Sequence, residues 1–414
     1  MRIAVTGATG LLGRNLLFEL IKRNLGNLDG LEVLILGRER DGRSIRERIT
    51  RIIQNDGLSY LGAQGNGHAQ RIRDYSQSGV TCLDADLQKP RLGLSQPDFE
   101  TLKRAPIDFF FHLAAFSDFS DSLRAVRVLR ETNVFGTRQV LDLVRSLRVR
   151  EFCYVGTAYS CGTATGRIPP NYTNLDQPFR NHYESTKLEG EILVHDFEKE
   201  SSVRCRYFRP SVLSGRLLEA PLGATCKFDA FYAYGAFLYR VKLKLLGRAG
   251  GGDLLQLKLR VHTHPESALN IVPVDFVAKV MAEVCLQQVE GSHFHIVNQR
   301  DTPFDNSLLP LFLETLGVVG PTCVSRIPND TNEMEFLYHR SVGQFLAPYM
   351  TAHPMTFDAG NLDAVLSRAG IECPDVNDRR HFALLMDYAK QHDFGIRMNA
   401  IPRIEPRCPC VSCA

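Results

Sequence analysis

The chain has 414 residues, of which 44% are hydrophobic and 23% charged, and a formal net charge of +3. This composition is typical of a globular protein with a full apolar core. No basic cluster is interleaved with aromatic side chains, so nucleic acid is not an expected partner. No apolar run is long enough to span a bilayer, and the first expected strand begins at Arg2, which leaves no room for a signal peptide. We therefore expect a cytoplasmic protein.

A glycine-rich turn follows the first expected strand, residues 2–6, and leads into an amphipathic helix that runs from Arg14 to Ile21. Strand, turn and helix in this order let the backbone approach a pyrophosphate, whose charge then lies at the helix N-terminus. A dinucleotide site is therefore expected here. Its residues are Gly7, Thr9, Gly10, Leu11, Leu12, Gly13 and Arg14.

The second expected strand, residues 32–36, ends in Gly37-Arg38. A site selective for NAD(H) usually places an acidic residue there to bind the ribose 2′-hydroxyl, whereas an arginine suits a 2′-phosphate. Arg38 is the first expected phosphate ligand and Arg48 is the second, while some neighbouring arginines only solvate a helix face. The cofactor is therefore expected to be NADP(H).

Two further buried strands are expected to border the cofactor. Asp86, at the end of residues 80–87, could accept a hydrogen bond from the adenine amino group with Leu87 beside it, although a simple turn aspartate is the alternative. A later strand ends at His112 and is followed by Ala114 and Ala115, whose small side chains leave room for a cofactor. His112 is expected to be a core histidine without a catalytic role. The polar residues 58–80 are expected to form a surface insertion.

Tyr183 and Lys187 lie four positions apart in a stretch expected to be helical, so both side chains project from one face. A nearby ammonium favours the phenolate, and the pair is expected to lower the pKa of the tyrosine from about 10 toward neutrality. Such a tyrosine can pass a proton to or from a carbonyl or alcohol oxygen. An exposed helical pair without a function is the alternative, because this spacing often arises by chance.

In their order and spacing the motifs resemble the extended short-chain dehydrogenase/reductases, over essentially the whole chain. The shared motifs are the glycine turn, Asp86-Leu87, His112-x-Ala-Ala115, Asn133-x-x-Gly136-Thr137, Thr157 at a strand end, and Tyr183-x-x-x-Lys187. The resemblance implies an α/β fold, a Rossmann-type doubly wound parallel sheet with a smaller, mainly helical C-terminal substrate lobe.

The family roles, carried over by position, give three catalytic residues. Thr157 would hydrogen-bond the substrate carbonyl oxygen, Tyr183 would deliver the proton, and Lys187 would hold the nicotinamide ribose and keep the tyrosine acidic. Tyr183 and Lys187 therefore also count as cofactor ligands. The resemblance places four more residues beside the cofactor, namely Asn133, Arg209, Pro210 and Ser211. Dimerisation through the helix that carries Tyr183 is common in the family, so a homodimer is possible.

Several details resemble the thioester reductases, the group that holds fatty acyl-CoA reductases and the reductase domains of carboxylic acid reductases and nonribosomal peptide synthetases. Gly10-Leu-Leu-Gly13-Arg14 is similar to their Gly-Phe-Leu-Gly-Arg, and Gly156-Thr157-Ala-Tyr159 to their Ser-Thr-Ala-Tyr. The spacing from Arg38 to Arg46-Glu-Arg48 also matches, whereas Leu11 and Gly156 depart from the pattern. The resemblance implies an NADPH-dependent reductase of an acyl thioester, carried by CoA or by an acyl or peptidyl carrier protein, that yields an aldehyde or alcohol.

Other functions remain open at this point. A sugar-nucleotide epimerase or dehydratase, or a hydroxysteroid-type dehydrogenase, would share the same three catalytic residues, although Gly37-Arg38 argues against an epimerase with bound NAD. An NADP-binding regulatory protein is the alternative outside enzymes. The retention of Thr157, Tyr183 and Lys187 together argues against it.

We expect residues 1–215 to form the NADP-binding domain, with residues 270–300 returning to it. Residues 216–269 and 302–400 are expected to form the substrate lobe. The aromatic run 227–239 could line an acyl tunnel or pack as a helix, and the basic residues 240–248 could meet a carrier protein or form a solvated helix face.

The last residues, 401–414, contain three cysteines, Cys408, Cys410 and Cys413. Their spacing fits no common zinc site and no histidine accompanies them, so no metal site is expected. The tail is expected to be disordered.

Overall fold

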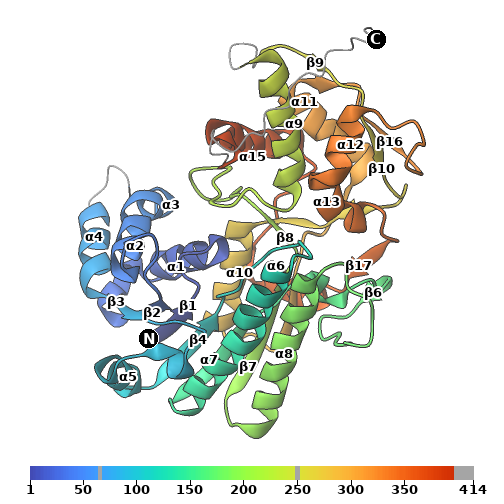
Figure 1. Cartoon of the computed structure of the whole chain (residues 1–414). Coiled ribbons are helices and arrows are strands. Elements are labelled where there is room, and N and C mark those ends of the chain that lie inside the picture. Colours follow the sequence, from blue (N-terminus) through green and yellow to red (C-terminus); the bar gives the residue numbers. More distant parts are fainter. Residues whose placement is uncertain (64–67, 248–251, 396–414) are drawn as a thin grey trace, which may run out of the picture.

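The computed structural model describes residues 1–63, 68–247 and 252–395 of the chain (Figure 1). The prediction for residues 401–414, with their three cysteines, lies outside the described residues. Figure 1 shows an α/β part that contains the N-terminus and, above it, a mainly helical lobe formed by later segments. None of the helices in the described ranges is long and apolar enough to cross a membrane.

Seven parallel strands form the central sheet, as expected for a doubly wound fold. Their order is β13 (His293–Ile296), β7 (Arg204–Pro210), β5 (Val149–Val155), β4 (Ile107–His112), β1 (Arg2–Thr6), β2 (Glu32–Gly37) and β3 (Val80–Asp84). The chain builds outward from β1 to β3 and then crosses to β4, so the order reverses between β1 and β4. The loops after these two strands part there, and ligands of such sheets bind in the resulting crevice.

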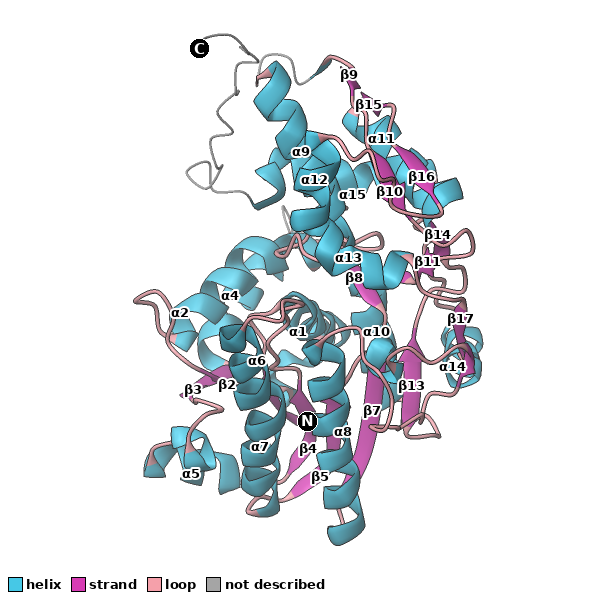
Figure 2. Cartoon of the chain, turned by 45° about the vertical axis from the view of Figure 1, so that its right-hand side comes forward, coloured by secondary structure: helices cyan, strands magenta, loops and turns pink. Residues whose placement is uncertain are grey.

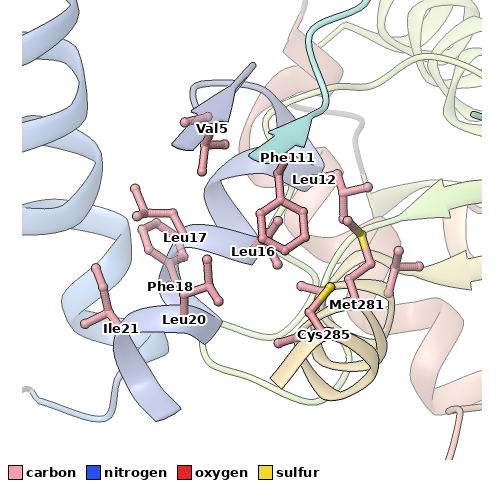
Figure 3. Packing of buried hydrophobic residues seen from close by; sticks show 14 of the residues in the cluster. Val5, Leu12, Leu16, Leu17, Phe18, Leu20, Ile21, Phe111, Met281 and Cys285 are labelled. Carbon is pink, nitrogen blue, oxygen red and sulfur yellow. The ribbon is translucent and has the colours of Figure 1, made fainter. Parts of the chain in front are cut away.

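Helices cover both faces of the sheet, which explains why its strands read as continuous apolar runs. Phe110 in β4 faces α5 (Gln96–Lys103), α7 (Gly136–Arg145) and α8 (His182–Glu200), whereas Phe109 and Phe111 face α1 (Leu11–Arg23) and α10 (Val274–Leu286). Figure 3 shows the second of these interfaces, where Phe111 packs near Leu16 of α1 and Met281 of α10.

The polar stretch 58–80 contributes to this core more than a surface insertion would. It contains α3 (Leu58–Tyr60) and α4 (His68–Ser78), next to α2 (Ile45–Ile52). Tyr60, Ile72 and Tyr75 are buried against α1 and β2. The apolar residues of α4 are few, but their spacing of three places them on one face of a helix.

The C-terminal lobe has an apolar core of its own. Its helices are α9 (Phe231–Leu246), α11 (Leu309–Leu316), α12 (Glu333–Arg340), α13 (Val342–Met350) and α15 (Arg379–Gln391). The remaining strands pair two by two: β6 (Gly166–Ile168) with β17 (Met355–Phe357), β9 (Leu255–Gln256) with β15 (Val318–Val319), β10 (Arg260–His262) with β16 (Thr322–Val324), and β11 (Ala268–Leu269) with β14 (Thr302–Pro303). The aromatic side chains of α9 pack mainly inside this core, which favours helix packing over a tunnel.

Lys242 in α9 does not lie on the basic surface that was expected for this run of residues. Its side chain is buried, and its Nζ donates to the Leu316 carbonyl oxygen at 2.8 Å, at the C-terminal end of α11. That carbonyl lies at the negative end of the helix dipole, which suits a cation. Only Arg240 and Lys244, of the described basic residues in this run, are exposed.

The chain returns from the lobe to the sheet through β12 (Ile271–Pro273), which pairs in parallel with β8 (Val212–Ser214). Helix α10 and strand β13 follow. One later helix, α14 (Gly360–Ala369), packs on α10 and β13 although it lies within residues 302–400 (Figure 2). Its Leu362 and Val365 belong to the apolar core of the sheet.

Candidate active site

A cleft of about 1320 Å³ lies between the carboxyl ends of the strands and the C-terminal lobe. It extends from the glycine turn and Arg38 past Thr157, Tyr183 and Lys187 to Tyr349 of α13. All but two of the residues expected at the site line this cleft, and the exceptions are Asn133 and Arg209.

The glycine turn at one end of the cleft requires residues without a Cβ. Gly7 has φ +78°, and a Cβ there would lie 2.5 Å from the Ala114 nitrogen. A Cβ on Gly13 would collide with the Gly7 carbonyl oxygen. Gly10 precedes α1, which has neither a capping side chain nor an acidic residue in its first turn. Its first backbone N–H groups are therefore free to bind an anionic group such as a pyrophosphate.

Arginines gather beside this turn. Arg48 donates from Nη2 to Thr9 Oγ1 and from Nη1 to the Arg38 carbonyl oxygen, both at 3.0 Å. Burial, followed by the nearby charges of Arg40, Arg14 and Arg38, lowers the pKa of Arg48 from its ordinary value. Guanidinium groups crowded in this way are stabilised by an anion between them. The turn and the arginines together form a cationic end of the cleft that suits the phosphates of a dinucleotide.

Asp86 is a turn aspartate, as the alternative to an adenine ligand predicted. It also lines the cleft. Its Oδ1 accepts a hydrogen bond from the Gln88 nitrogen at 3.0 Å. His112 is a core histidine, as expected. Its Nδ1 lies 2.7 Å from Thr6 Oγ1 and its Nε2 lies 3.1 Å from Thr137 Oγ1, and burial lowers its pKa to about 3.

Thr157 lies just after β5, where the backbone is extended and the chain turns into a short helical segment. Its Oγ1 accepts a hydrogen bond from the Tyr159 nitrogen at 3.3 Å and lies 3.5 Å from the Pro210 carbonyl oxygen. Only 6% of the residue is exposed, on the side of the cleft. The hydroxyl is thus held at a fixed place at the end of the sheet.

Tyr183 is half-buried at the start of α8, with its ring centroid 5.7 Å from that of Phe119. Within the part of the chain that the structure describes, no hydrogen bond engages its hydroxyl. Burial raises the pKa of Tyr183 above its ordinary value, and the charges of Asp229 and Glu184 add to this effect. The expected lowering by Lys187 is therefore wrong. The phenol is protonated at neutral pH and can donate.

Lys187 lies one helical turn after Tyr183 and is buried, with its Nζ 4.5 Å from the centroid of the Tyr154 ring. Burial lowers the pKa of Lys187 to about 8, although the Glu191 carboxylate opposes this effect. The ammonium is therefore weakly solvated and turned toward an aromatic face, which explains why it does not acidify Tyr183.

Asn133 does not line the cleft, and its side-chain amide is engaged in hydrogen bonds within the protein. Its side chain accepts from the Phe116 nitrogen at 2.9 Å, and donates to the Phe116 carbonyl oxygen at 3.0 Å and to Thr186 Oγ1 at 3.1 Å. It therefore fastens the loop after β4 to helix α8.

Arg209 is also a structural residue here, because its guanidinium is fully buried against Glu191 of α8. Arg209 Nη2 donates to Glu191 Oε1 at 2.6 Å, and Nε lies 3.1 Å from both carboxylate oxygens. A Cβ on Gly156 would lie 2.8 Å from Glu191 Oε2. Gly156 therefore makes room for the ion pair. Pro210 and Ser211, next along the chain, do line the cleft, and Ser211 Oγ donates to Asn270 Oδ1 at 2.6 Å.

Tyr349 reaches the site from the C-terminal lobe, and the sequence motifs did not reveal it. Its hydroxyl donates to Glu184 Oε1 at 2.8 Å and accepts from Asn181 Nδ2 at 2.7 Å. Its ring contacts Phe119, which in turn packs on Tyr183. The 165 residues between Tyr349 and Glu184 leave no local spacing to detect. Asn181 and Glu184 could have been found, because their spacing is that of a helix N-cap.

The sheet, the crevice at its point of reversal, the glycine turn and the grouping of Thr157, Tyr183 and Lys187 define the class of protein. The chain is an oxidoreductase of the extended short-chain dehydrogenase/reductase type, with a domain for a nicotinamide dinucleotide. A model of the male sterility protein family matches residues 5–281, about two thirds of the chain. The chain belongs to this family.

Two relatives illustrate the range of this similarity. The chain is 22% identical over 396 residues to a subunit of the linear gramicidin synthase of Brevibacillus parabrevis, covering 93% of this chain and 7% of that protein. It is 33% identical over 159 residues to fatty acyl-CoA reductase 1 of Xenopus laevis, covering 38% of this chain and 28% of that one. The chain thus spans only a small part of the relatives that it matches.

Solved structures show the same fold. The terminal R domain from the myxalamid PKS-NRPS biosynthetic pathway superposes with a TM-score of 0.68 at 20% identity, over 95% of this chain and 91% of that one. UDP-glucuronic acid 4-epimerase from Bacillus cereus superposes with a TM-score of 0.56 at 14% identity, over 94% and 99%. At such identities the similarity extends to the fold alone.

Replacement of Gly13 by alanine is predicted to weaken dinucleotide binding at least about tenfold (~1.4 kcal/mol), because the new Cβ would displace the Gly7 carbonyl and open the turn. The dissociation constant of NADPH, measured by fluorescence titration, tests this. Gly26→Ala is the matched control, since a Cβ on Gly26 meets no atom of residues 1–63, 68–247 or 252–395 within 4 Å. Equal affinities for both variants would contradict the role of the turn.

The Tyr349→Phe substitution is predicted to lower the free energy of unfolding by about 1–3 kcal/mol, because Glu184 and Asn181 each lose a buried hydrogen-bond partner. Urea denaturation measures the effect. Tyr338→Phe serves as the control, since among the described residues the Tyr338 hydroxyl bonds only the sulfur of Met350, at 3.7 Å. If Tyr338→Phe lowered the free energy of unfolding as much as Tyr349→Phe does, the hydrogen bonds of Tyr349 to Glu184 and Asn181 would not explain the loss of stability.

Proposed function

We propose that the chain reduces an acyl thioester with NADPH, and that the thioester is carried by CoA or by an acyl or peptidyl carrier protein. The observation that carries this proposal is that Thr157, a protonated Tyr183 and Lys187 share one cleft with a phosphate-binding turn. The names of the relatives, part of a peptide synthase and a fatty acyl-CoA reductase, support a thioester as substrate.

The cofactor fits the residues that border the cleft. The backbone of Gly10 to Gly13 would bind the pyrophosphate, and Arg38 and Arg48 would bind the 2′-phosphate of the adenosine ribose. Lys187 would hold the hydroxyls of the nicotinamide ribose. NADPH, when bound, supplies the hydride for the carbonyl carbon.

The side chains of Thr157 and Tyr183 would donate hydrogen bonds to the carbonyl oxygen of the thioester. Donors placed where negative charge develops stabilise a transition state by roughly 3 kcal/mol each. Tyr183 would then pass its proton to that oxygen. Cleavage of the carbon–sulfur bond releases the thiol and leaves an aldehyde, which a second reduction would convert to an alcohol.

Apolar side chains border the end of the cleft away from the glycine turn, and they would accommodate the acyl group. Leu213 belongs to β8, Leu269 belongs to β11, and Phe231 and Leu346 come from helices α9 and α13 of the lobe. Phe231 is the member of the aromatic run in α9 that reaches the cleft. The lobe thus supplies most of the wall that would select the acyl chain.

Replacement of Tyr183 by phenylalanine is predicted to slow NADPH oxidation with an acyl-CoA at least about 100-fold, because the variant lacks the proton donor. Tyr172→Phe is the matched control, since the Tyr172 hydroxyl bonds Gln177 away from the cleft. A panel of acyl-CoA esters, an acyl-pantetheine and UDP-glucose distinguishes a thioester reductase from a sugar-nucleotide enzyme. Turnover of UDP-glucose but of no thioester would refute the proposal.

Arg38→Ala is predicted to reduce the preference for NADPH over NADH at least about tenfold, because the charge that faces the 2′-phosphate is lost. The ratio of kcat/KM values for the two cofactors measures the preference. Arg46→Ala is the control, because Arg46 is exposed on the same helix as Arg48 but does not line the cleft. An unchanged ratio in Arg38→Ala would show that Arg38 does not bind the 2′-phosphate.

The pKa of Lys187, about 8, predicts how activity depends on pH. Lys187 is charged below this value and neutral above it, so kcat/KM for NADPH is expected to fall as the pH rises through about 8. In Lys187→Arg the charge persists at high pH, and this decline should disappear even where the activity is lower. A profile that stays flat to pH 9.5 in the unaltered protein would contradict the proposed role of the ammonium.

A further inference from the structure

Three potential metal ligands meet at the outer edge of the sheet, outside the cleft. Glu191 and His195 lie four residues apart on one face of α8, and His293 begins β13, the edge strand (Figure 2). The ligand atoms of all three lie within 4.8 Å of one another. Ninety-eight residues separate His195 from His293, so sequence spacing alone could not bring them together.

The two imidazole rings lie side by side on one face of Tyr207. Their centroids are 4.2 and 4.3 Å from that of Tyr207, with interplanar angles of 19° and 10°. The centroids of the two imidazoles are only 5.1 Å apart, so the two rings cannot lie on opposite faces of the tyrosine ring. His195 Nε2 and His293 Nε2 therefore approach each other edge to edge, at 3.4 Å.

This spacing matches a tetrahedral metal site. Two nitrogens that each lie about 2.1 Å from a zinc ion at the tetrahedral angle are about 3.4 Å apart. Glu191 Oε1 lies 3.6 Å from His195 Nε2, a comparable separation. His293 Nδ1 lies 2.9 Å from Ser292 Oγ, a contact that fixes the ring as the outer partners of metal-bound histidines do.

We propose that Glu191, His195 and His293 bind one divalent cation of the zinc class and that this ion ties the catalytic helix α8 to the edge strand β13. Two imidazoles and a carboxylate suit zinc, and a water molecule completes the tetrahedron because 23% of the His195 side chain is exposed. The site does not depend on the proposed reductase activity.

Arg209 shares the carboxylate of Glu191 and sets the strength of the site. Its Nη2 lies 2.6 Å from Oε1, the same oxygen that faces His195. The guanidinium reduces the charge that the carboxylate offers to a cation. The affinity is therefore lower than that of a zinc site with two histidines and an unshared carboxylate, and the ion is exchangeable.

Titration of the 414-residue chain with Co²⁺, followed by visible absorption, tests the site. We expect one equivalent of tetrahedral Co²⁺ without a thiolate charge-transfer band, displaced by Zn²⁺. His195→Ala and His293→Ala should each weaken this binding at least tenfold. His264→Ala is the matched control, because His264 forms a comparable ring pair with His353, also 5.1 Å apart, but in edge-to-face geometry.

The absorption bands separate the site from the cysteines of the chain. A spectrum with thiolate bands that persists in His195→Ala would place the metal on Cys153 and Cys285 beside Glu151, or on the C-terminal cysteines, and would overturn the proposal. Equal loss of binding in His264→Ala would overturn it as well. In support, Zn²⁺ should raise the melting temperature of the unaltered protein and of His264→Ala, but not of His195→Ala.

Discussion

The buried ion pair between Glu191 and Arg209 is the interaction on which the arrangement of the active site depends. Both side chains are fully buried, and the pair joins α8 to β7 beneath the end of β5. Burial alone would raise the pKa of Glu191, but Arg209 and His195 bring it down to about 2. Removal of either partner would leave an unpaired buried charge, at a cost of about 3–5 kcal/mol. Gly156, next to Thr157, provides the space that the carboxylate needs.

A second tie holds the same helix from the other side. Tyr349 of the C-terminal lobe completes the hydrogen bonds of Glu184 and Asn181 at the start of α8, next to Tyr183. The helix is therefore fixed to the sheet near its middle and to the lobe at its N-terminus. Between these points the protein holds a protonated phenol and a buried ammonium, Lys187, whose pKa is close to neutrality. The buried ammonium is costly to desolvate, and the two anchors hold the helix that carries it.

Local spacing made much of this architecture predictable from the sequence. The glycine turn and the pair on α8 are set by neighbours within a few residues, and the order of motifs was sufficient to predict the doubly wound sheet. Contacts between distant segments were not predictable. Arg209 lies within β7 and its side chain turns to Glu191, Asn133 turns to Phe116, and Lys242 caps a helix inside the lobe. The pKa of Tyr183 depends on burial, which spacing does not reveal.

The transfer of deuterium from NADPH to product tests the central claim most directly. The enzyme would be incubated with an acyl-pantetheine and NADPH that carries deuterium at both C4 positions, and the product would be analysed by mass spectrometry. A thioester reductase places one deuterium on the former carbonyl carbon of an aldehyde, or two if the product is the alcohol. A product without deuterium, or an unchanged thioester under conditions in which NADPH binds, would contradict the account.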